Sequence, residues 1–69
     1  MTVNELTKNL WYHQEIEIAE KEYKADRKDR IVWTGNNSTL RASDINTVKI
    51  RHKEVVSFGA TDNKLIIVV

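Results

Sequence analysis

The fold is decided by the last fifteen residues, VVSFGATDNKLIIVV (55–69), whose pattern is typical of two β-strands joined by a polar turn. Apolar side chains recur at every second position of both strands, which places them on one face of a sheet. Between the strands lies TDNK (61–64), and Asp and Asn tolerate the left-handed backbone that a tight turn requires. We therefore predict a β-hairpin with Phe58, Leu65 and Ile67 in the core.

The second strand of this hairpin is apolar on both faces. Ile66 and Val68 alternate with the inward residues and therefore point to the other side of the sheet. A strand of this composition is normally covered on both sides. The cover over Ile66 and Val68 is either another part of the same chain or a second copy of the chain, which would make these residues an oligomer contact. The sequence leaves both alternatives open.

The N-terminal residues predict a helix that packs on this sheet. Thr2 followed by Glu5 is a capping-box pattern, and the apolar residues of 3–10 recur at spacings of three and four. Two turns of helix are unstable alone in water, so the apolar side of the helix needs the sheet. The next segment, 15–20, alternates glutamate with apolar residues. It predicts a first strand with its isoleucines inward and its glutamates outward.

The middle of the chain has weaker patterns. Nine of the eleven side chains in 20–30 are charged at neutral pH, with mixed sign, which favours an exposed hairpin extension or loop. A strand is predicted from about 30 to 34, ended by the Gly and Asn residues of 34–38. The Ser-Asp pair that opens 43–47 fits the N-cap of a short helical turn. Apolar and basic residues alternate in 48–51, so extended chain is predicted there.

These segments predict one α+β domain that spans residues 1–69. An N-terminal helix packs on a four-stranded, mainly antiparallel sheet, with a short helical turn near 43–47. One ring of the pair Trp11 and Tyr12 is expected in the core and the other partly exposed. The expected core side chains are Val3, Leu6, Leu10, Ile16, Ile18, Leu40, Val56, Phe58, Leu65 and Ile67.

The composition excludes several classes of protein. The chain has no cysteine, which excludes disulfides and thiolate metal sites. Eleven Lys and Arg nearly balance ten Asp and Glu to give a net charge of +1, which argues against general coating of nucleic acid. The longest apolar run is five residues, far short of the roughly 20 that span a bilayer. The first residues lack the basic and apolar stretches of a signal peptide, so we expect a cytoplasmic protein without a membrane partner.

No enzyme or metal motif is present in the sequence. His13 and His52 lack a second ligand at a metal-binding spacing, because Glu17, four residues after His13, belongs to a predicted strand. No serine is flanked by glycines, and Gly35 and Gly59 stand alone, so neither a nucleophile elbow nor a phosphate-binding loop is predicted. We expect a non-enzyme with no metal and no cofactor.

Two sets of side chains are candidates for binding. Exposed aromatic residues anchor protein interfaces, and a protein-binding site is predicted from Trp11, Tyr23, Arg27, Lys28, Arg30 and Trp33. A nucleic-acid site would use the basic segments 27–30 and 49–53, with Lys49, Arg51 and Lys53 following a phosphate backbone. Acidic residues interleave with these basic residues, which favours a solvated surface over a phosphate site.

Four motifs stand in order at the two ends of the chain. They are Thr2-Val3-Asn4-Glu5-Leu6 with Leu10, Glu15-Ile16-Glu17-Ile18, Val55-Val56-Ser57-Phe58-Gly59-Ala60 before Asp62-Asn63, and Leu65-Ile66-Ile67-Val68-Val69. In this order they resemble a class of small uncharacterised proteins from phages and prophages of Gram-positive bacteria. The matched residues are nearly all core or turn residues, so the resemblance implies a fold and a phage-like origin and transfers no active site.

Small phage proteins of this size often bind and block a host protein, CRISPR and other defence components included. The resemblance therefore implies a non-enzymatic accessory protein that binds a host protein in the host cytoplasm and inhibits it. The residues leave two alternatives, a small nucleic-acid-binding protein and a structural homo-oligomer that buries Ile66 and Val68.

Overall fold

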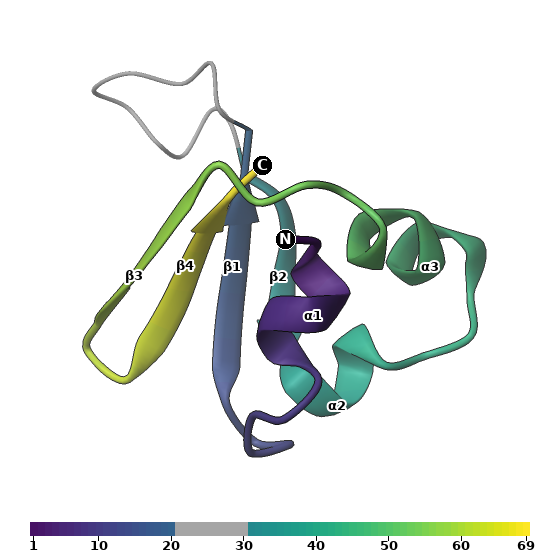
Figure 1. The fold of residues 1–69 in the computed structure, drawn as a ribbon. Helices are drawn as coiled ribbons and strands as arrows, with labels where there is room; N and C mark the ends of the chain where they lie inside the picture. Colours follow the sequence, from purple (N-terminus) through teal and green to yellow (C-terminus); the bar gives the residue numbers. More distant parts are fainter. Residues whose placement is uncertain (21–30) are drawn as a thin grey trace.

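The computed structural model describes residues 1–20 and 31–69, which form a four-stranded sheet with helices on one face (Figure 1). In chain order the elements are α1 (Val3–Thr7), β1 (Glu15–Ala19), β2 (Ile31–Asn36), α2 (Asn37–Leu40), α3 (Ile45–Arg51), β3 (Ser57–Thr61) and β4 (Lys64–Val68). The predicted α+β class, with a helix at the N-terminus and a four-stranded sheet, is confirmed.

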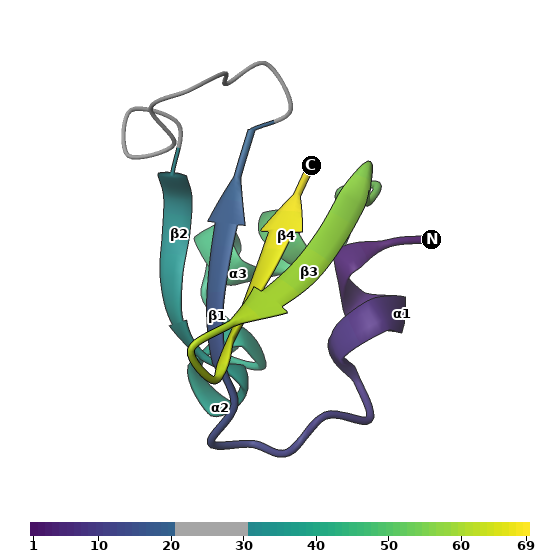
Figure 2. The ribbon, with the colours of Figure 1, turned by 90° about the vertical axis from the view of Figure 1, so that its left-hand side faces the viewer.

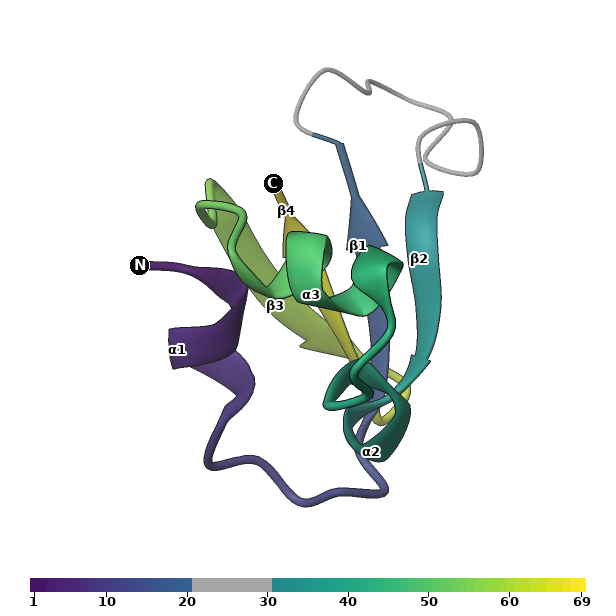
Figure 3. The same cartoon turned by 90° about the vertical axis from the view of Figure 1, so that its right-hand side faces the viewer.

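The sheet has the strand order β2-β1-β4-β3. The outer pairs, β1 with β2 and β3 with β4, are antiparallel, whereas the central pair, β1 with β4, is parallel. The sheet is therefore mainly antiparallel, as predicted. The helices α2 and α3 connect β2, at one edge of the sheet, to β3, at the other edge, and they lie across one face of the sheet (Figure 3). This crossover lets β4 run parallel to β1. The two strands with isoleucine on their inward side occupy the centre, where burial is greatest.

The C-terminal hairpin forms as predicted. Its register runs without interruption from Thr61 opposite Lys64 to Ser57 opposite Val68. Asp62 and Asn63 make the turn with φ angles of 50° and 64°, the left-handed backbone of a type I′ hairpin.

The N-terminal helix begins as predicted but ends earlier. The Thr2 N–H donates to the Glu5 carboxylate at 2.8 Å, and the Glu5 N–H donates to the Thr2 hydroxyl at 3.2 Å. These bonds complete the capping box. The Thr2 N–H, together with the Thr2 hydroxyl 3.3 Å from the same carboxylate oxygen, lowers the pKa of Glu5. The helix stops at Thr7 rather than near Leu10, because the side chain of Asn37 binds the carbonyls of Thr7 and Leu10 and holds the chain away from the helix axis.

The strand β2 continues past the glycine that was expected to end it. A Cβ at Gly35 would lie 2.8 Å from the Thr39 hydroxyl and 2.8 Å from the Trp33 ring. Glycine therefore serves close packing inside the strand here, not a turn. The paired asparagines that follow start α2 instead, with Asn36 as its N-cap.

Residues 48–51 are helical, so the prediction of extended chain there is wrong. They belong to α3, whose N-cap is Asp44 as predicted. The alternation over four residues also fits a helix, because Thr47 and Ile50, three residues apart, are the two buried positions of α3.

The core lies between the sheet and the helices. Its buried cluster consists of Val3, Ile16, Ile18, Leu40, Ile50 and Ile67, and Leu6, Leu10, Trp33, Val55, Leu65 and Val69 pack against it. Two predicted core residues are wrong, since Val56 is 57% exposed and Phe58 is 54% exposed. They lie just before and within β3, which is an edge strand with all five residues exposed. Val55 takes the core position instead.

Ile66 and Val68 lie on the sheet face opposite the helices, because they alternate with Leu65 and Ile67, which pack into the core. Figure 2 shows this face, with the strands in front of the helices. Both residues are half-buried, and no helix or strand among the described residues covers them. Glu17 lies beside Ile66 on this face, as predicted. It is buried, with 8% of its surface exposed, and its carboxylate lies 3.6 Å from the Lys64 amine.

Candidate functional site

The segment that joins α1 to β1 presents large aromatic side chains to solvent. Trp11 is 65% exposed and Tyr12 is 58% exposed, so the expectation that one of these rings lies in the core is wrong. Leu10 and Trp33 pack against the core cluster instead. We call residues 11–14, with the sequence Trp-Tyr-His-Gln, the aromatic loop.

The rings of the aromatic loop contact one another. The ring centroids of Trp11 and His13 are 4.9 Å apart with the planes at 78°, an edge-to-face arrangement. The rings of Tyr12 and His13 lie 4.3 Å apart and tilted. Tilted and edge-to-face pairs at this separation are favourable. His13 therefore holds the two larger rings in one cluster.

Hydrogen bonds from the N-terminus of α2 hold the backbone of the aromatic loop. The first N–H groups of a helix have no partner within the helix. In α2 they donate to loop carbonyls, Asn37 to Gln14 at 2.9 Å and Ser38 to Tyr12 at 2.8 Å. The loop thus caps the helix, and the helix holds the loop.

Asn37 holds the start of the loop as well. Its side chain is 2% exposed, and its amide nitrogen donates to the carbonyls of Thr7 at 3.0 Å and Leu10 at 3.1 Å. Asn37 therefore binds the chain before the exposed rings through its side chain and after them, at Gln14, through its backbone N–H.

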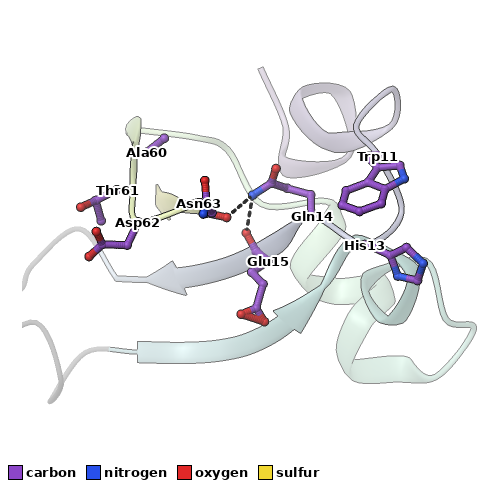
Figure 4. A pocket seen from close by; sticks show the side chains of 8 residues that line it. All are labelled: Trp11, His13, Gln14, Glu15, Ala60, Thr61, Asp62 and Asn63. Atoms are coloured by element: carbon purple, nitrogen blue, oxygen red, sulfur yellow. Dashed lines mark hydrogen bonds between the residues drawn. The ribbon is translucent and has the colours of Figure 1, made fainter.

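The far end of the loop is tied to the C-terminal hairpin. The Gln14 amide nitrogen donates to the carbonyl of Asn63 at 2.9 Å and to that of Glu15 at 3.0 Å (Figure 4). This bond joins residues 49 positions apart in the sequence and brings the hairpin turn beside the aromatic loop.

A hollow of about 700 Å³ lies between the loop and the hairpin turn. Its lining residues are Trp11, His13, Gln14, Glu15, Ala60, Thr61, Asp62 and Asn63. Figure 4 shows the rings of Trp11 and His13 at one end and Thr61 and Asp62 at the other. Among the described residues of the lining, the charged side chains are the carboxylates of Glu15 and Asp62, and none is Lys or Arg. The hollow therefore combines an aromatic wall with negative charge.

The structure separates the side chains that the sequence grouped into a protein-binding site. Trp11 is exposed in the aromatic loop, whereas Trp33 is half-buried against the core. Tyr23, Arg27, Lys28 and Arg30 lie outside the described residues. Tyr12, which the sequence left open between core and interface, is exposed beside Trp11. His13, Gln14 and the hairpin turn are additional members of the site, and the run of three ring-bearing residues at 11–13 was the signal for His13.

The basic residues 49–53 differ in their surroundings. Lys49 and Lys53 are exposed, but Arg51 is half-buried and its Nη1 donates to the carbonyls of Leu40 at 2.7 Å and Ala42 at 2.8 Å. Arg51 thus ties α3 to the segment that precedes it. Burial and the nearby charge of Arg51 lower the pKa of the Arg41 guanidinium.

The described residues form neither a metal site nor a membrane-spanning helix, and the chain matches no known protein family. Within residues 1–20 and 31–69, no group of three His, Asp or Glu side chains is placed to hold a metal ion. In the same ranges, no helix is long and apolar enough to cross a membrane. No protein-family model matches the chain, and no curated protein or solved structure is significantly similar to it.

Proposed function

We propose that this chain is a non-enzymatic protein-binding module whose contact surface is the aromatic loop. The observation that carries the proposal is the combination of two large, mostly exposed rings with a backbone held by α2 and by Asn37. Trp and Tyr are enriched among the residues that dominate binding energy at protein interfaces. A loop that is ordered before binding loses little conformational entropy on association.

The hollow beside the rings favours a partner with a basic side chain. A Lys or Arg that entered it would meet the Trp11 ring and the carboxylates of Glu15 and Asp62. Cations bind to the faces of tryptophan rings, and carboxylates form charge-assisted hydrogen bonds with them. The same negative charge opposes nucleic acid, because single strands bind where stacking rings line a positive groove. Arg51, one of the predicted phosphate ligands, donates to backbone carbonyls, which also favours a protein partner.

The contents of the hollow support a non-enzymatic role. Thr61 carries the hydroxyl group of the lining and His13 its imidazole, but they lie at opposite ends (Figure 4). A hydroxyl nucleophile that uses a histidine base, as in serine hydrolases, needs the imidazole within hydrogen-bond reach. The resemblance to small phage proteins supplies the class of partner, a host protein in the cytoplasm, with CRISPR and other defence factors as candidates.

A capture experiment with matched variants tests this proposal. Immobilised wild-type protein is compared with Trp11→Ala/Tyr12→Ala in lysate of a Gram-positive bacterium, the host that the resemblance indicates. Ile45→Ala/Lys49→Ala is the control, because it removes two exposed side chains from α3. Loss of a hot-spot residue costs about 2 kcal/mol or more, so the loop variant should lose a specific partner that the control retains.

Charge reversal then separates the parts of the surface. Glu15→Lys/Asp62→Lys should weaken capture of the same partner if its basic side chain enters the hollow. Reversal of Arg27, Lys28 and Arg30 tests the part of the predicted surface outside the described residues. Capture that persists in the loop variant would overturn the proposal.

A further inference from the structure

The edge of the sheet at β3 carries none of the features that usually protect an exposed strand. β3 lies at one side of the sheet (Figure 2), and among residues 1–20 and 31–69 its only strand partner is β4. Its sequence, Ser-Phe-Gly-Ala-Thr, has no charge and no proline, in a chain of which 30% is charged. Edge strands usually carry lysine, proline or a bulge to prevent pairing with other strands. β3 is therefore open to a further strand.

The opposite edge, at β2, differs. The ladder between β1 and β2 shifts register between Ile18 and Ala19, an irregularity of the kind that bends an edge away from pairing. β2 also continues directly into α2. The β3–β4 ladder is regular from Ser57 to Thr61. Its irregular bond, from the Val56 N–H to the Val68 carbonyl at 2.7 Å, lies just before β3. Of the two edges, β3 is therefore the unprotected one.

The hairpin geometry determines which backbone groups of β3 are available. Thr61 and Lys64 flank a two-residue turn, so they exchange hydrogen bonds with each other. Bonded and non-bonded pairs alternate along an antiparallel ladder. Gly59 therefore also directs its N–H and C=O toward β4, whereas those of Phe58 and Ala60 point away from the sheet.

We propose that a second copy of this chain pairs with this edge, β3 antiparallel to β3, about a two-fold axis at Gly59. Phe58 then lies opposite Ala60 of the other copy, and Ala60 opposite Phe58. Since both residues direct their free groups outward, this register forms two bonded pairs and four hydrogen bonds. The two sheets become one sheet of eight strands with a closed, isologous interface.

The side chains of β3 fit this register with itself. The large Phe58 meets the small Ala60 on one face, and Ser57 meets the hydroxyl of Thr61 on the other. At the axis the two Gly59 residues form a non-bonded pair, in which the Cα atoms approach to about 4.5 Å. A Cβ built on Gly59 has no atom within 4 Å, and a hollow of about 280 Å³ lies along β3 and β4.

A second copy explains features of β3 that an unrelated strand would not require. The proposed pairing places the side chains of 57–61 against those of the same segment in the other copy, and this segment carries no charge that the pairing would desolvate without an opposite charge across from it. The exposed side chain of Phe58 gains contacts with Ala60 of the other copy. β3 has no charged side chain that would favour an oppositely charged strand of another protein.

Sedimentation equilibrium tests the proposal from low micromolar to millimolar concentrations. The wild type should show a reversible equilibrium between monomer and dimer. Phe58→Lys/Ala60→Lys places like charges opposite each other in both bonded pairs, which should weaken the dimer about tenfold or more. Ser57→Lys/Thr61→Lys does the same on the other face. The control Ile45→Lys/Asn46→Lys adds the same charge at exposed positions of α3 and should leave the dimer unchanged.

Mixing establishes the register. Phe58→Glu/Ala60→Glu should also be monomeric alone, yet an equimolar mixture with Phe58→Lys/Ala60→Lys should form a heterodimer. Recovery in the mixture also shows that both variants are folded. A wild type that stays monomeric at millimolar concentration overturns a second copy as the occupant and leaves the edge to a strand of another protein. A dimer that the β3 variants leave intact overturns it equally.

Discussion

Replacement of Asn37 by alanine tests whether one buried side chain holds the aromatic loop. The change removes two hydrogen bonds, to Thr7 and Leu10, each worth about 1 kcal/mol net. The carbonyls of Thr7 and Leu10 lose a buried donor, which destabilises the variant further. In the opposite direction, the Asn37 Oδ1 is buried without a partner, and its removal saves the free energy of desolvating it. These two terms are similar in size, so the expected loss is about 2 kcal/mol.

A loss of this size is a large fraction of the total stability of the protein. A domain of 69 residues has a free energy of unfolding of about 3–10 kcal/mol. Urea unfolding followed by circular dichroism measures the change, with Asn46→Ala as control, because Asn46 is an exposed residue of α3 and its loss should stay within about 0.5 kcal/mol.

The isosteric variant Asn37→Asp separates hydrogen bonding from volume. A carboxylate keeps the shape of the amide but cannot donate to two carbonyls, so this variant should be at least as unstable as Asn37→Ala at neutral pH. Amide exchange at Ser38, whose N–H is bonded to Tyr12, should accelerate in both. A loss of less than about 0.5 kcal/mol in Asn37→Ala, the range of an ordinary surface change, would refute the stabilising role of these two hydrogen bonds.

Three further predictions follow from the fold. Gly35→Ala should destabilise the protein by about 1–3 kcal/mol in urea, because the added Cβ would lie 2.8 Å from atoms of Thr39 and Trp33; an unchanged midpoint would contradict this contact. Val56→Thr should change the free energy of unfolding by no more than about 0.5 kcal/mol in dilute protein, whereas Ile67→Ala should lower it by about 2–5 kcal/mol. Equal losses in the two variants would show that Val56 is a core residue. The Thr47 N–H lowers the pKa of Asp44 below its ordinary 3.8, so the contact stabilises the fold above pH 3.8, and this stabilisation is lost as the pH falls through the lower pKa of the folded state. Asp44→Asn should therefore reduce the fall in the free energy of unfolding over that pH range. A fall as steep as that of the wild type would contradict this prediction.

The central strands could be predicted from the sequence because their periodicity agrees with their burial. Ile16, Ile18, Leu65 and Ile67 alternate with other residues and all lie on the inward face. Phe58 follows the same period and has the correct orientation, but it is exposed because β3 is the edge of the sheet. Strand order depends on the crossover through α2 and α3, which periodicity within one strand does not encode.

The candidate site could be predicted only in part for a related reason. The exposed Trp11 was identified from its residue type, whereas the groups that hold it come from distant segments. Asn37 and Asn63 reach the loop only after α2 and the hairpin are in place. Their local patterns predicted a turn at each position, and Asn37 instead forms the first residue of a helix.

Site-specific photocrosslinking tests the central claim, that the aromatic loop is the surface that contacts a protein partner. Benzoylphenylalanine is placed at Tyr12, in the loop, or at Asn46, on exposed α3, in the otherwise intact chain expressed in Gram-positive cells. We expect a specific crosslinked protein from position 12 and none from position 46. Identical products from both positions, or products from position 46 alone, would contradict it.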